Sequence, residues 1–362
     1  MSRIQQTSVL SEKTIYLELD RDEHPENYGE TEERRFERRA DVLPEIDVYV
    51  RDICKGDGVA WVEASHPSLE SKFIFVRPHA SSIESHRRLE RNSMRLKLYI
   101  EEAHFRMRSP DIRRSEEFHL FADACVELQA EPRDYYKPDA LCRDSLRNGD
   151  IENQLVQLIR AKSTHPEYVA RVRRRKEQCT RNFKSASLFL EKAFQTFQKL
   201  WFIRLELEYK PAHRQVLNFH VPQKDLTRMW NLCRSKKYEP TFGVVVGYIR
   251  KLEFTSTKGF YWHLILLLDW SRMESGYPYA KNIGDYWSNQ VTRGKGHYRY
   301  YESDAPELRA YGVGLIDRDQ HLERSLLLMR GIGYLTRKDQ YFRPSFKGLR
   351  SFQTSEISVA GK

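Results

Sequence analysis

The stretch GYIRKLEFTSTKGFYWHLILLLD, residues Gly247–Asp269, decides the fold of the C-terminal half of this chain. Its second part is a nearly continuous apolar run, and the Lys-Gly pair before that run is typical of a tight turn. We therefore predict two antiparallel strands joined by a loop at Thr255–Gly259. The second strand is too apolar to lie outside the core.

The register of this hairpin predicts which polar groups share a face, because side chains alternate along a strand. It sets Glu253 opposite Tyr261 and Lys251 opposite His263. A carboxylate, a phenol, an ammonium group and an imidazole then cluster on one face. The other face is apolar and should carry the helices; it holds Tyr248, Leu252, Trp262, Leu264, Leu266 and Leu268.

Two of these polar residues are candidate metal ligands. Glu253 and His263, with water, could hold a hard divalent ion such as Mg²⁺ or Mn²⁺, although two protein ligands are few. The alternative is a cross-strand Lys-Glu pair beside a hydrogen-bonded histidine. Spacing alone favours that alternative.

The composition is that of a soluble globular protein. The chain has 362 residues, 40% hydrophobic and 31% charged, which is enough for two domains. Its longest apolar run, Leu264–Leu268, is far too short to cross a membrane, so we expect no membrane partner. The N-terminus lacks a secretory pattern, which predicts a cytoplasmic protein. Five scattered cysteines without a CxxC pair argue against disulfides and a zinc site.

Positive charge is concentrated in the C-terminal half. Residues 181–362 hold 30 Lys and Arg against 17 Asp and Glu, whereas residues 1–180 hold 31 against 34. A polyanion would therefore bind the C-terminal half. Aromatic and basic residues alternate in YRYY, Tyr298–Tyr301, which favours a nucleic acid over a charge surplus that only keeps the protein soluble.

The chain divides into four predicted regions. Residues 1–45 are densely charged and predicted to be disordered, and residues 46–180 form a mostly α-helical accessory domain. Residues 181–352 show strand, helix, strand, strand, helix, strand and helix in turn. This order favours an α+β fold, a mainly antiparallel sheet with helices on one face. Residues 353–362 are predicted to be a flexible tail.

A candidate nucleophile lies downstream in the sequence YLTRK. Tyr334 precedes Lys338 by one helical turn, so both project from the same face of a helix. A tyrosine hydroxyl is a poor nucleophile unless a cation and a metal-polarised phosphate assist it. The alternative is a core tyrosine near a helix end.

The blocks GYIRKLEF, KGFYWHLILLLD, IGDYWSNQVTRGKGHY, YGVGLID and YLTRKDQY follow one another between about Trp201 and Phe352. In this order they resemble the YagK/YfjJ C-terminal-domain family of prophage and filamentous-phage (inovirus) proteins. That family is similar to rolling-circle replication initiators of the HUH endonuclease class. The resemblance implies an RRM-like sheet that binds a metal through a His-x-His strand and an acidic residue. It also implies a tyrosine that cleaves one DNA strand.

Under this resemblance Glu253 matches the acidic ligand, His263 the second histidine, and Tyr334 with Lys338 the nucleophile motif. Tyr261 stands where the first histidine is expected, so the metal motif is incomplete. Either another group such as His297 compensates, or nicking is reduced or lost and a DNA-binding scaffold remains.

The leading hypothesis is therefore a mobile-element protein that binds single-stranded or origin DNA and nicks it through Tyr334 with a divalent metal. One alternative is a catalytically inactive DNA-binding or regulatory protein with the same fold. Another is a host-interaction protein, in which the N-terminal region contacts host replication proteins. The residues expected to contact nucleic acid are Arg204, Arg250, Lys251, Arg293, Lys295, Arg299 and Arg337.

Overall fold

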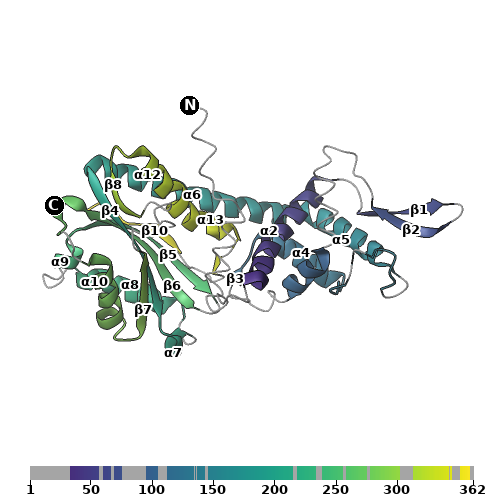
Figure 1. Ribbon diagram of the computed structural model, residues 1–362, viewed down its shortest axis with the longest axis horizontal. Coiled ribbons are helices and arrows are strands. Elements are labelled where there is room, and N and C mark those ends of the chain that lie inside the picture. Colours follow the sequence, from purple (N-terminus) through teal and green to yellow (C-terminus); the bar gives the residue numbers. More distant parts are fainter. Residues whose placement is uncertain are drawn as a thin grey trace. The chain divides into compact units, whose positions relative to one another are not determined.

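The computed structural model describes residues 33–56, 60–66, 69–75, 95–104, 112–133, 135, 137–142, 146–214, 218–233, 239–255, 258–274, 278–301, 313–341, 343–344 and 351–358 (Figure 1). They divide into two compact units between Lys176 and Glu177. This division falls within a single helix, α6 (Pro166–Thr196). The sequence predicts a boundary at residue 180, but no Gly or Pro interrupts α6 after its first residue, so one helix runs through it.

The N-terminal unit is built mainly from helices. Its elements are α2 (Glu33–Lys55), a helix over residues 95–104, α4 (Glu116–Glu127), α5 (Asn148–Ser163) and the first part of α6. Strands β1 (Trp61–His66) and β2 (Leu69–Phe75) form an antiparallel hairpin, and β3 (Ile112–Arg113) is a short strand. Among the helices in the described part of the chain, none is long and apolar enough to cross a membrane.

Helix α2 begins inside the segment predicted to be disordered. Val42, Ile46, Tyr49 and Ile53 follow one another at spacings of three or four residues, and all are buried. This stripe stabilises residues 42–55 as a helix against its neighbours despite the dense charge before it. The backbone of residues 33–45 is helical, while residues 1–32 lie outside the described residues.

The C-terminal unit combines helices with an antiparallel sheet, as predicted. The strands are β4 (Lys199–Tyr209), β5 (Val245–Thr255), β6 (Gly259–Asp269), β7 (Gly296–Tyr301), β8 (Gly314–Asp317), β9 (Arg343–Pro344) and β10 (Phe352–Thr354). The helices are α7 (Pro211–Arg214), α8 (His220–Cys233), α9 (Glu239–Phe242), η4 (Trp270–Arg272), α10 (Tyr279–Tyr286), η5 (Trp287–Val291), α12 (His321–Leu326), η6 (Leu327–Ile332) and α13 (Gly333–Tyr341). The six-stranded sheet has the order β10-β5-β6-β4-β7, and β8 also pairs with β4.

The predicted hairpin is confirmed as β5 and β6. Glu253 pairs with Tyr261 and Lys251 with His263, as the alternation requires. Gly259, at the end of the turn, has φ of 65°, a conformation that glycine adopts without strain.

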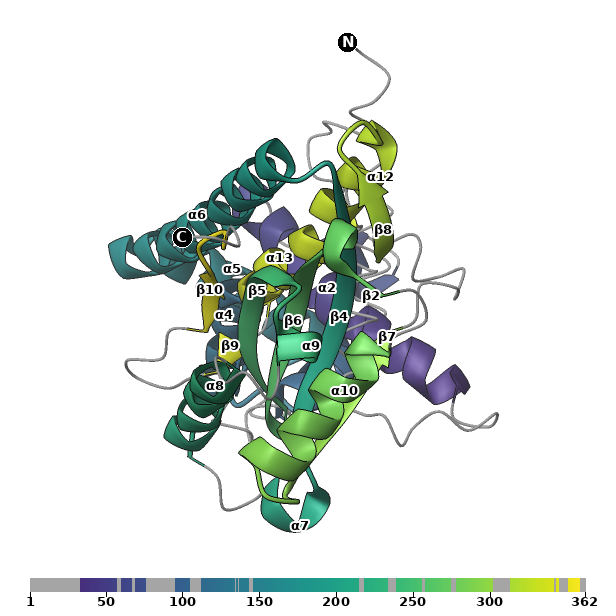
Figure 2. The ribbon, with the colours of Figure 1, turned by 90° about the vertical axis from the view of Figure 1, so that its left-hand side faces the viewer.

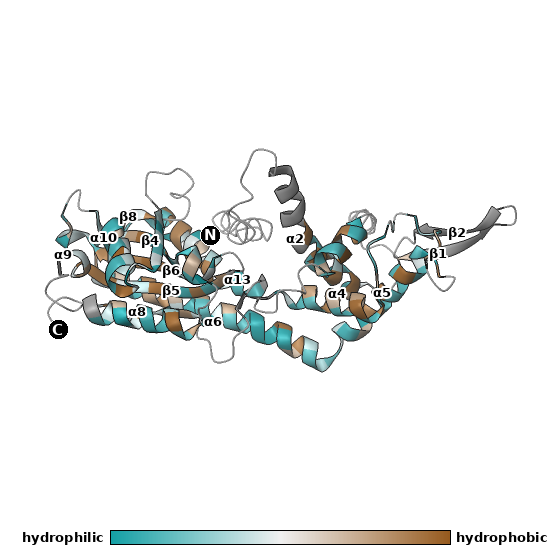
Figure 3. Ribbon diagram, turned by 90° about the horizontal axis from the view of Figure 1, so that it is seen from below, coloured by the Kyte–Doolittle hydropathy of each residue, from teal (hydrophilic) through white to brown (hydrophobic). Residues whose placement is uncertain are grey.

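One face of the sheet is a hydrophobic core. Leu264, Leu266 and Trp262 of β6 are buried there with residues of α8, α10 and η5. The hydrophobic colouring of β6 in Figure 3 corresponds to its complete burial. From the helices come Leu226, Met229, Tyr279, Ile283, Tyr286, Trp287 and Val291.

The opposite face is also covered by helices, so the expectation of helices on one face is wrong. The ring of Phe194, in α6, lies 5.9 Å from that of Phe202 in β4. The Lys251 ammonium group donates to the backbone oxygen of Leu335 in α13, at 2.5 Å. Figure 2 shows α6 and α13 on the side of the sheet away from α8 and α10. This second cover buries the polar side chains of β4, β5 and β6.

The segment predicted to be a flexible tail extends the edge of the sheet. β10 pairs with β5, and the N–H groups of Ser355 and Ser358 donate to Tyr248 and Val246 at 2.9 and 2.8 Å. These contacts satisfy backbone groups that an edge strand would otherwise leave open. Residues 359–362 of the predicted tail lie outside the described residues.

Two helices of this unit contain π-helical turns. In η5 the Thr292 N–H donates to the Trp287 oxygen, five residues earlier. In η6 the Gly333 N–H does the same to Leu328, directly before α13. Such wide turns insert an extra residue into a helix and are frequent at functional sites.

Candidate functional site: a buried ion network on the sheet

Two carboxylates of β4 face away from the hydrophobic core. Glu206 and Glu208 alternate with Leu205 and Leu207, so they project from the opposite face. Their side chains are 1% and 0% exposed. His263 and Lys258 contact Glu206, and Arg299 and Arg214 contact Glu208, so this polar face is closed by neighbouring side chains.

Glu206 joins β4 to the histidine of β6. Its Oε1 lies 2.7 Å from Nε2 of His263, which stands opposite it in the sheet. Its Oε2 lies 3.4 Å from Nζ of Lys258, at the turn of the β5–β6 hairpin. This ammonium group also lies 4.9 Å from the centre of the Tyr261 ring. The turn lysine therefore reaches back over the sheet.

Glu208 is held by two arginines. Arg299 of β7 approaches its Oε1 at 2.7 Å, and Arg214 of α7 lies 3.4 Å from Oε2. Burial raises the pKa of Glu208, and the neighbouring carboxylate of Glu206 raises it further. Arg299 and Lys258 lower the pKa, but the net effect is a raised value. The carboxylate thus depends on these cations to remain ionised.

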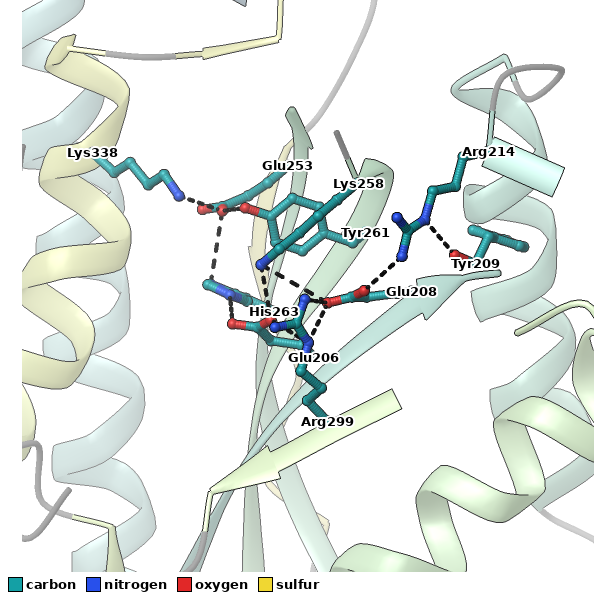
Figure 4. A network of polar contacts seen from close by, with 10 residues as sticks. All are labelled: Glu206, Glu208, Tyr209, Arg214, Glu253, Lys258, Tyr261, His263, Arg299 and Lys338. Carbon is teal, nitrogen blue, oxygen red and sulfur yellow. Dashed lines mark hydrogen bonds and ion pairs between the residues drawn. The ribbon is translucent and has the colours of Figure 1, made fainter. Parts of the chain in front are cut away.

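Glu253 is the third carboxylate of the network, which is shown in Figure 4. The Tyr261 hydroxyl donates to its Oε2 at 2.7 Å, and the Lys338 ammonium group of α13 does so at 2.7 Å. Nδ1 of His263 lies 3.8 Å from the same oxygen. The ammonium group of Lys251 lies 3.5 Å from Oε1.

These cations set the charge of Glu253. Burial alone would raise the pKa of this carboxyl group, but Lys338, then His263 and Lys251, outweigh burial and hold the pKa well below its usual value. Glu253 is therefore ionised at neutral pH, and two ammonium groups balance its charge.

Tyr334 lies over the same face of the sheet. Its side chain is 1% exposed. Its ring centre is 5.6 Å from the guanidinium carbon of Arg204 and 5.5 Å from Nζ of Lys338. Because Lys338 contacts Glu253, the helix α13 brings the predicted nucleophile motif to the predicted ligands. Glu253 thus contacts Lys338 and lies near His263, while Tyr334 contacts Lys338.

The residues expected to contact nucleic acid do not form one surface. Arg204 and Lys251 are 7% and 1% exposed, and they belong to the buried network, so that role is wrong for both. Arg299 is 43% exposed but binds Glu208. Arg250 and Arg337 are half-buried, the former donating to Gln353, while Arg293 and Lys295 are exposed.

Sequence reasoning missed half of the network, namely Glu206, Glu208, Lys258, Arg214 and Asp339. Asp339 lies 3.0 Å from the ammonium group of Lys251. Glu206 and Glu208 alternate with leucines in a strand beside the hairpin, which is the signal that could have identified them. Arg214 and Asp339 lie in separate helices, and no local pattern relates them to the sheet.

The residues present do not fit a divalent metal ion. Two buried atoms near each other make no hydrogen bond within the described part of the chain, Nδ1 of His263 and Oε1 of Glu253. A hard divalent ion needs more ligands than these two, and the ammonium groups of Lys338 and Lys251 already flank the carboxylate. The Tyr261 hydroxyl donates a hydrogen bond to Glu253 and so adds no ligand.

Other residues do not complete such a site. His297 is exposed on β7, where it stands opposite Glu208 of β4 in the strand register. Because β4 separates β7 from β6, His297 lies roughly 10 Å from β6. Compensation by His297 is therefore wrong. Among the described residues, no group of three or more His, Cys, Asp and Glu side chains could hold a metal ion.

Comparison of the chain with protein-family models, with curated proteins and with solved structures finds no match. The function proposed below therefore rests on the geometry of the C-terminal unit.

Proposed function

We propose that the C-terminal unit is a DNA-binding module of the rolling-circle replication-initiator type, from a mobile element, whose sheet site is a structural ion network and not a nicking centre. This is the catalytically inactive alternative among the hypotheses above. It accounts for both the placement of α13 and the closure of the site.

The topology of the sheet supports an RRM-like fold. The elements β4, α8, β5, β6, α10 and β7 follow one another in the chain as strand, helix, strand, strand, helix and strand. Their strands lie in the order β5-β6-β4-β7, with both helices on the apolar face. This split βαβ arrangement is the one that RRM domains use, and the face without α8 and α10 is the one that binds nucleic acid in them.

The observation that carries the proposal is the position of α13. This helix lies over the sheet face that holds Glu253 and His263, and it presents Tyr334 and Lys338 to that face. A replication initiator requires the same relation between its tyrosine and its ligands. An unrelated α+β protein has no need of it.

The chemistry of the site argues against nicking in this arrangement. A nucleophile must come within about 3 Å of the phosphorus that it attacks. Tyr334 is 1% exposed, and Lys338, which would stabilise the developing charge, is bound to Glu253. A DNA strand cannot reach the hydroxyl while α13 is in place, and the divalent ion has no adequate ligand set.

The nicking enzyme remains a second candidate because of one observation. The same four residues stand together, and the π-helical η6 directly before α13 is the kind of wide turn that often accompanies functional sites. In that function α13 swings away from the sheet before DNA enters. The tyrosine oxygen then bonds to phosphorus while the bond from phosphorus to the 3′ oxygen breaks.

The two candidates separate in one experiment. The full chain is incubated with a fluorescently labelled single-stranded DNA and Mn²⁺, and covalent adducts are resolved by denaturing electrophoresis. Binding is followed in parallel by fluorescence anisotropy over a series of KCl concentrations. We expect salt-dependent binding without an adduct, because phosphate contacts release counterions.

Tyr334→Phe is the matched control because it keeps the ring between Arg204 and Lys338 and removes the hydroxyl. An adduct that forms with the wild-type chain and disappears in Tyr334→Phe would replace the proposal by the nicking enzyme. Absence of any salt-dependent binding would reject both.

A further inference from the structure

A second polar region lies on the other side of the sheet from the ion network. It is a groove of about 480 Å³ between α8 and the turn that joins η5 to β7. Tyr209, at the end of β4, lines it and packs its ring 5.6 Å from that of Trp287 in the hydrophobic core. The groove is lined by Tyr209, His213, Val221, Asp225, Arg228, Val291, Thr292, Arg293 and Lys295.

The groove has an excess of positive charge. Arg228, Arg293 and Lys295 line it, and in the described part of the chain none of them forms an ion pair. The single carboxylate of the lining is Asp225, whose Oδ2 accepts a hydrogen bond from the Tyr209 hydroxyl at 2.7 Å. This arrangement differs from the sheet network, where Lys258, Lys338 and Arg299 each contact a carboxylate.

The backbone of Arg293 is in an unfavourable conformation. Its φ is 54°, in the left-handed region where an arginine is strained, and Gly294 follows with φ of 84°. The turn is fixed because the Gly294 N–H donates to the Ser288 oxygen at 2.7 Å. Glycine or asparagine is usual at such a helix end. Arg293 thus occupies a position that favours glycine, and its side chain lines the groove.

The positive region continues along α8. A second hollow of about 430 Å³ is lined entirely by polar residues, His220, Gln223, Lys224, Thr227, Arg228 and Asn231. They recur at three or four residues and so form one stripe of the helix, and Arg228 lines both hollows. From His220 to Asn231 the stripe extends about 17 Å. The ring of Phe219 lies 3.9 Å from that of His220 at its first end.

We propose that this α8 groove, from Arg293 and Lys295 across Arg228 to the α8 stripe, binds the phosphates of a single-stranded nucleic acid. The inference rests on the proposed function and names the surface that performs it. An elongated band of cations without a carboxylate partner in the described part of the chain suits successive phosphates of a strand. The amide groups of Gln223 and Asn231 can donate further hydrogen bonds. The strand thus contacts the outer side of the helices, while the sheet face stays closed.

The test measures binding of a labelled 20-nucleotide DNA by anisotropy as a function of KCl concentration. The variants are Arg228→Ala, Lys295→Ala and the double variant. Each cation removed from a phosphate should reduce the slope of log K against log salt by about 0.7. The double variant should bind about tenfold or more weakly than the wild-type chain at low salt.

Arg272→Ala is the matched control. Arg272 is an exposed arginine in η4, directly after β6. The last residue of β6, Asp269, pairs with Leu200 near the start of β4. The groove lies at the other end of β4, so this variant removes the same charge far from it. The control should bind DNA like the wild-type chain.

Arg293→Gly separates a binding role from a structural one. Glycine relieves the left-handed strain, so the Tm should rise, while DNA binding and the salt slope should fall. An unchanged affinity in this variant and in the double variant, with intact binding by the wild-type chain, would reject the groove but leave the proposed function standing. Loss of binding by every protein, including the wild-type chain, would reject the proposed function.

Polyglutamate serves as the competing acidic polymer. If it displaces the DNA at equal charge concentration and responds to the same variants, the groove binds acidic polypeptides and the nucleic-acid proposal fails. We expect DNA to bind at least tenfold more tightly.

Discussion

One face of the six-stranded sheet buries Leu264, Leu266 and Trp262 beneath α8 and α10. The other holds Glu206 against His263 and Glu253 in an ion pair with Lys338 of α13. Both faces exclude water, but the interactions that compensate for burial are different. Apolar burial contributes about 25 cal/mol for each Å² removed from water. Buried ions instead lose their hydration, and the attraction between them roughly offsets the free energy of that desolvation.

The polar face is therefore not explained by stability. A set of apolar residues of similar volume would stabilise the same position of α13 at least as well. A network in which Glu253 depends on Lys338 fits the proposed inactive initiator, which retains the residues of a nicking site without its activity. Substitutions in the network and in the core test this contrast separately.

The largest effect is expected from Glu253→Ala. The substitution leaves Lys338 buried without its carboxylate and removes a partner of Lys251. We expect the free energy of unfolding to fall by about 3–5 kcal/mol, because an uncompensated buried charge is costly. Urea denaturation followed by circular dichroism measures it.

The control is the double variant Glu253→Leu with Lys338→Met, which replaces the pair by apolar groups. It should recover most of the stability that Glu253→Ala removes, because both charges are gone. If the double variant is as unstable as Glu253→Ala, the network stabilises the fold and the contrast between the two faces disappears.

On the apolar face, Leu266→Ala should lower the free energy of unfolding by about 3 kcal/mol. Leu266 is fully buried, so its removal costs both transfer free energy and a cavity. The same urea titration measures this decrease. No second substitution in the network should reverse it, in contrast to Glu253→Ala. If a charge-neutralising substitution on the polar face restored the stability that Leu266→Ala loses, the two faces would not contribute independently.

The smallest effect is on acid stability. Because the pKa of Glu253 is held below its usual value in the folded chain, its contribution is present above about pH 4.5 and is lost as the pH falls further. Between pH 4.5 and 3.5 this group should remove at most about 1.4 kcal/mol of stability.

Comparison with Glu253→Gln isolates this contribution, because other carboxylates titrate in both proteins. Glu208, whose pKa is raised, has the opposite dependence and loses its contribution as the pH rises. A wild-type chain with the same acid dependence as Glu253→Gln would show that Lys338 does not hold the carboxylate ionised.

Much of the sheet could be predicted because its signals are local. Strand alternation from Gly247 to Asp269 gives the correct pairing of Glu253 with Tyr261, and it identifies His263 on the same face. The turn residues and the continuous apolar run suffice for that. The position of Tyr334 over this face also follows from the resemblance of the sequence blocks.

The closure of the polar face could not be predicted, because it depends on segments far apart in the chain. Lys338 is 85 residues from Glu253, and the alternation of β4 gives no indication that Tyr334 of α13 covers Arg204. The sequence predicts Arg293 and Lys295 as nucleic-acid contacts, and both line the proposed groove. Its α8 side was missed because the stripe around Arg228 is also typical of any solvated helix face.

The π-helical turn of η6 has a consequence for how this protein can change over generations. Each residue of an α-helix advances its direction by about 100°. Loss of one codon among those for residues 327–332 would therefore close the wide turn and rotate α13 by about that angle. Tyr334 and Lys338 would then turn away from the sheet, although every side chain of the network would still be encoded. This segment should tolerate exchanges of residues far better than any change in its length.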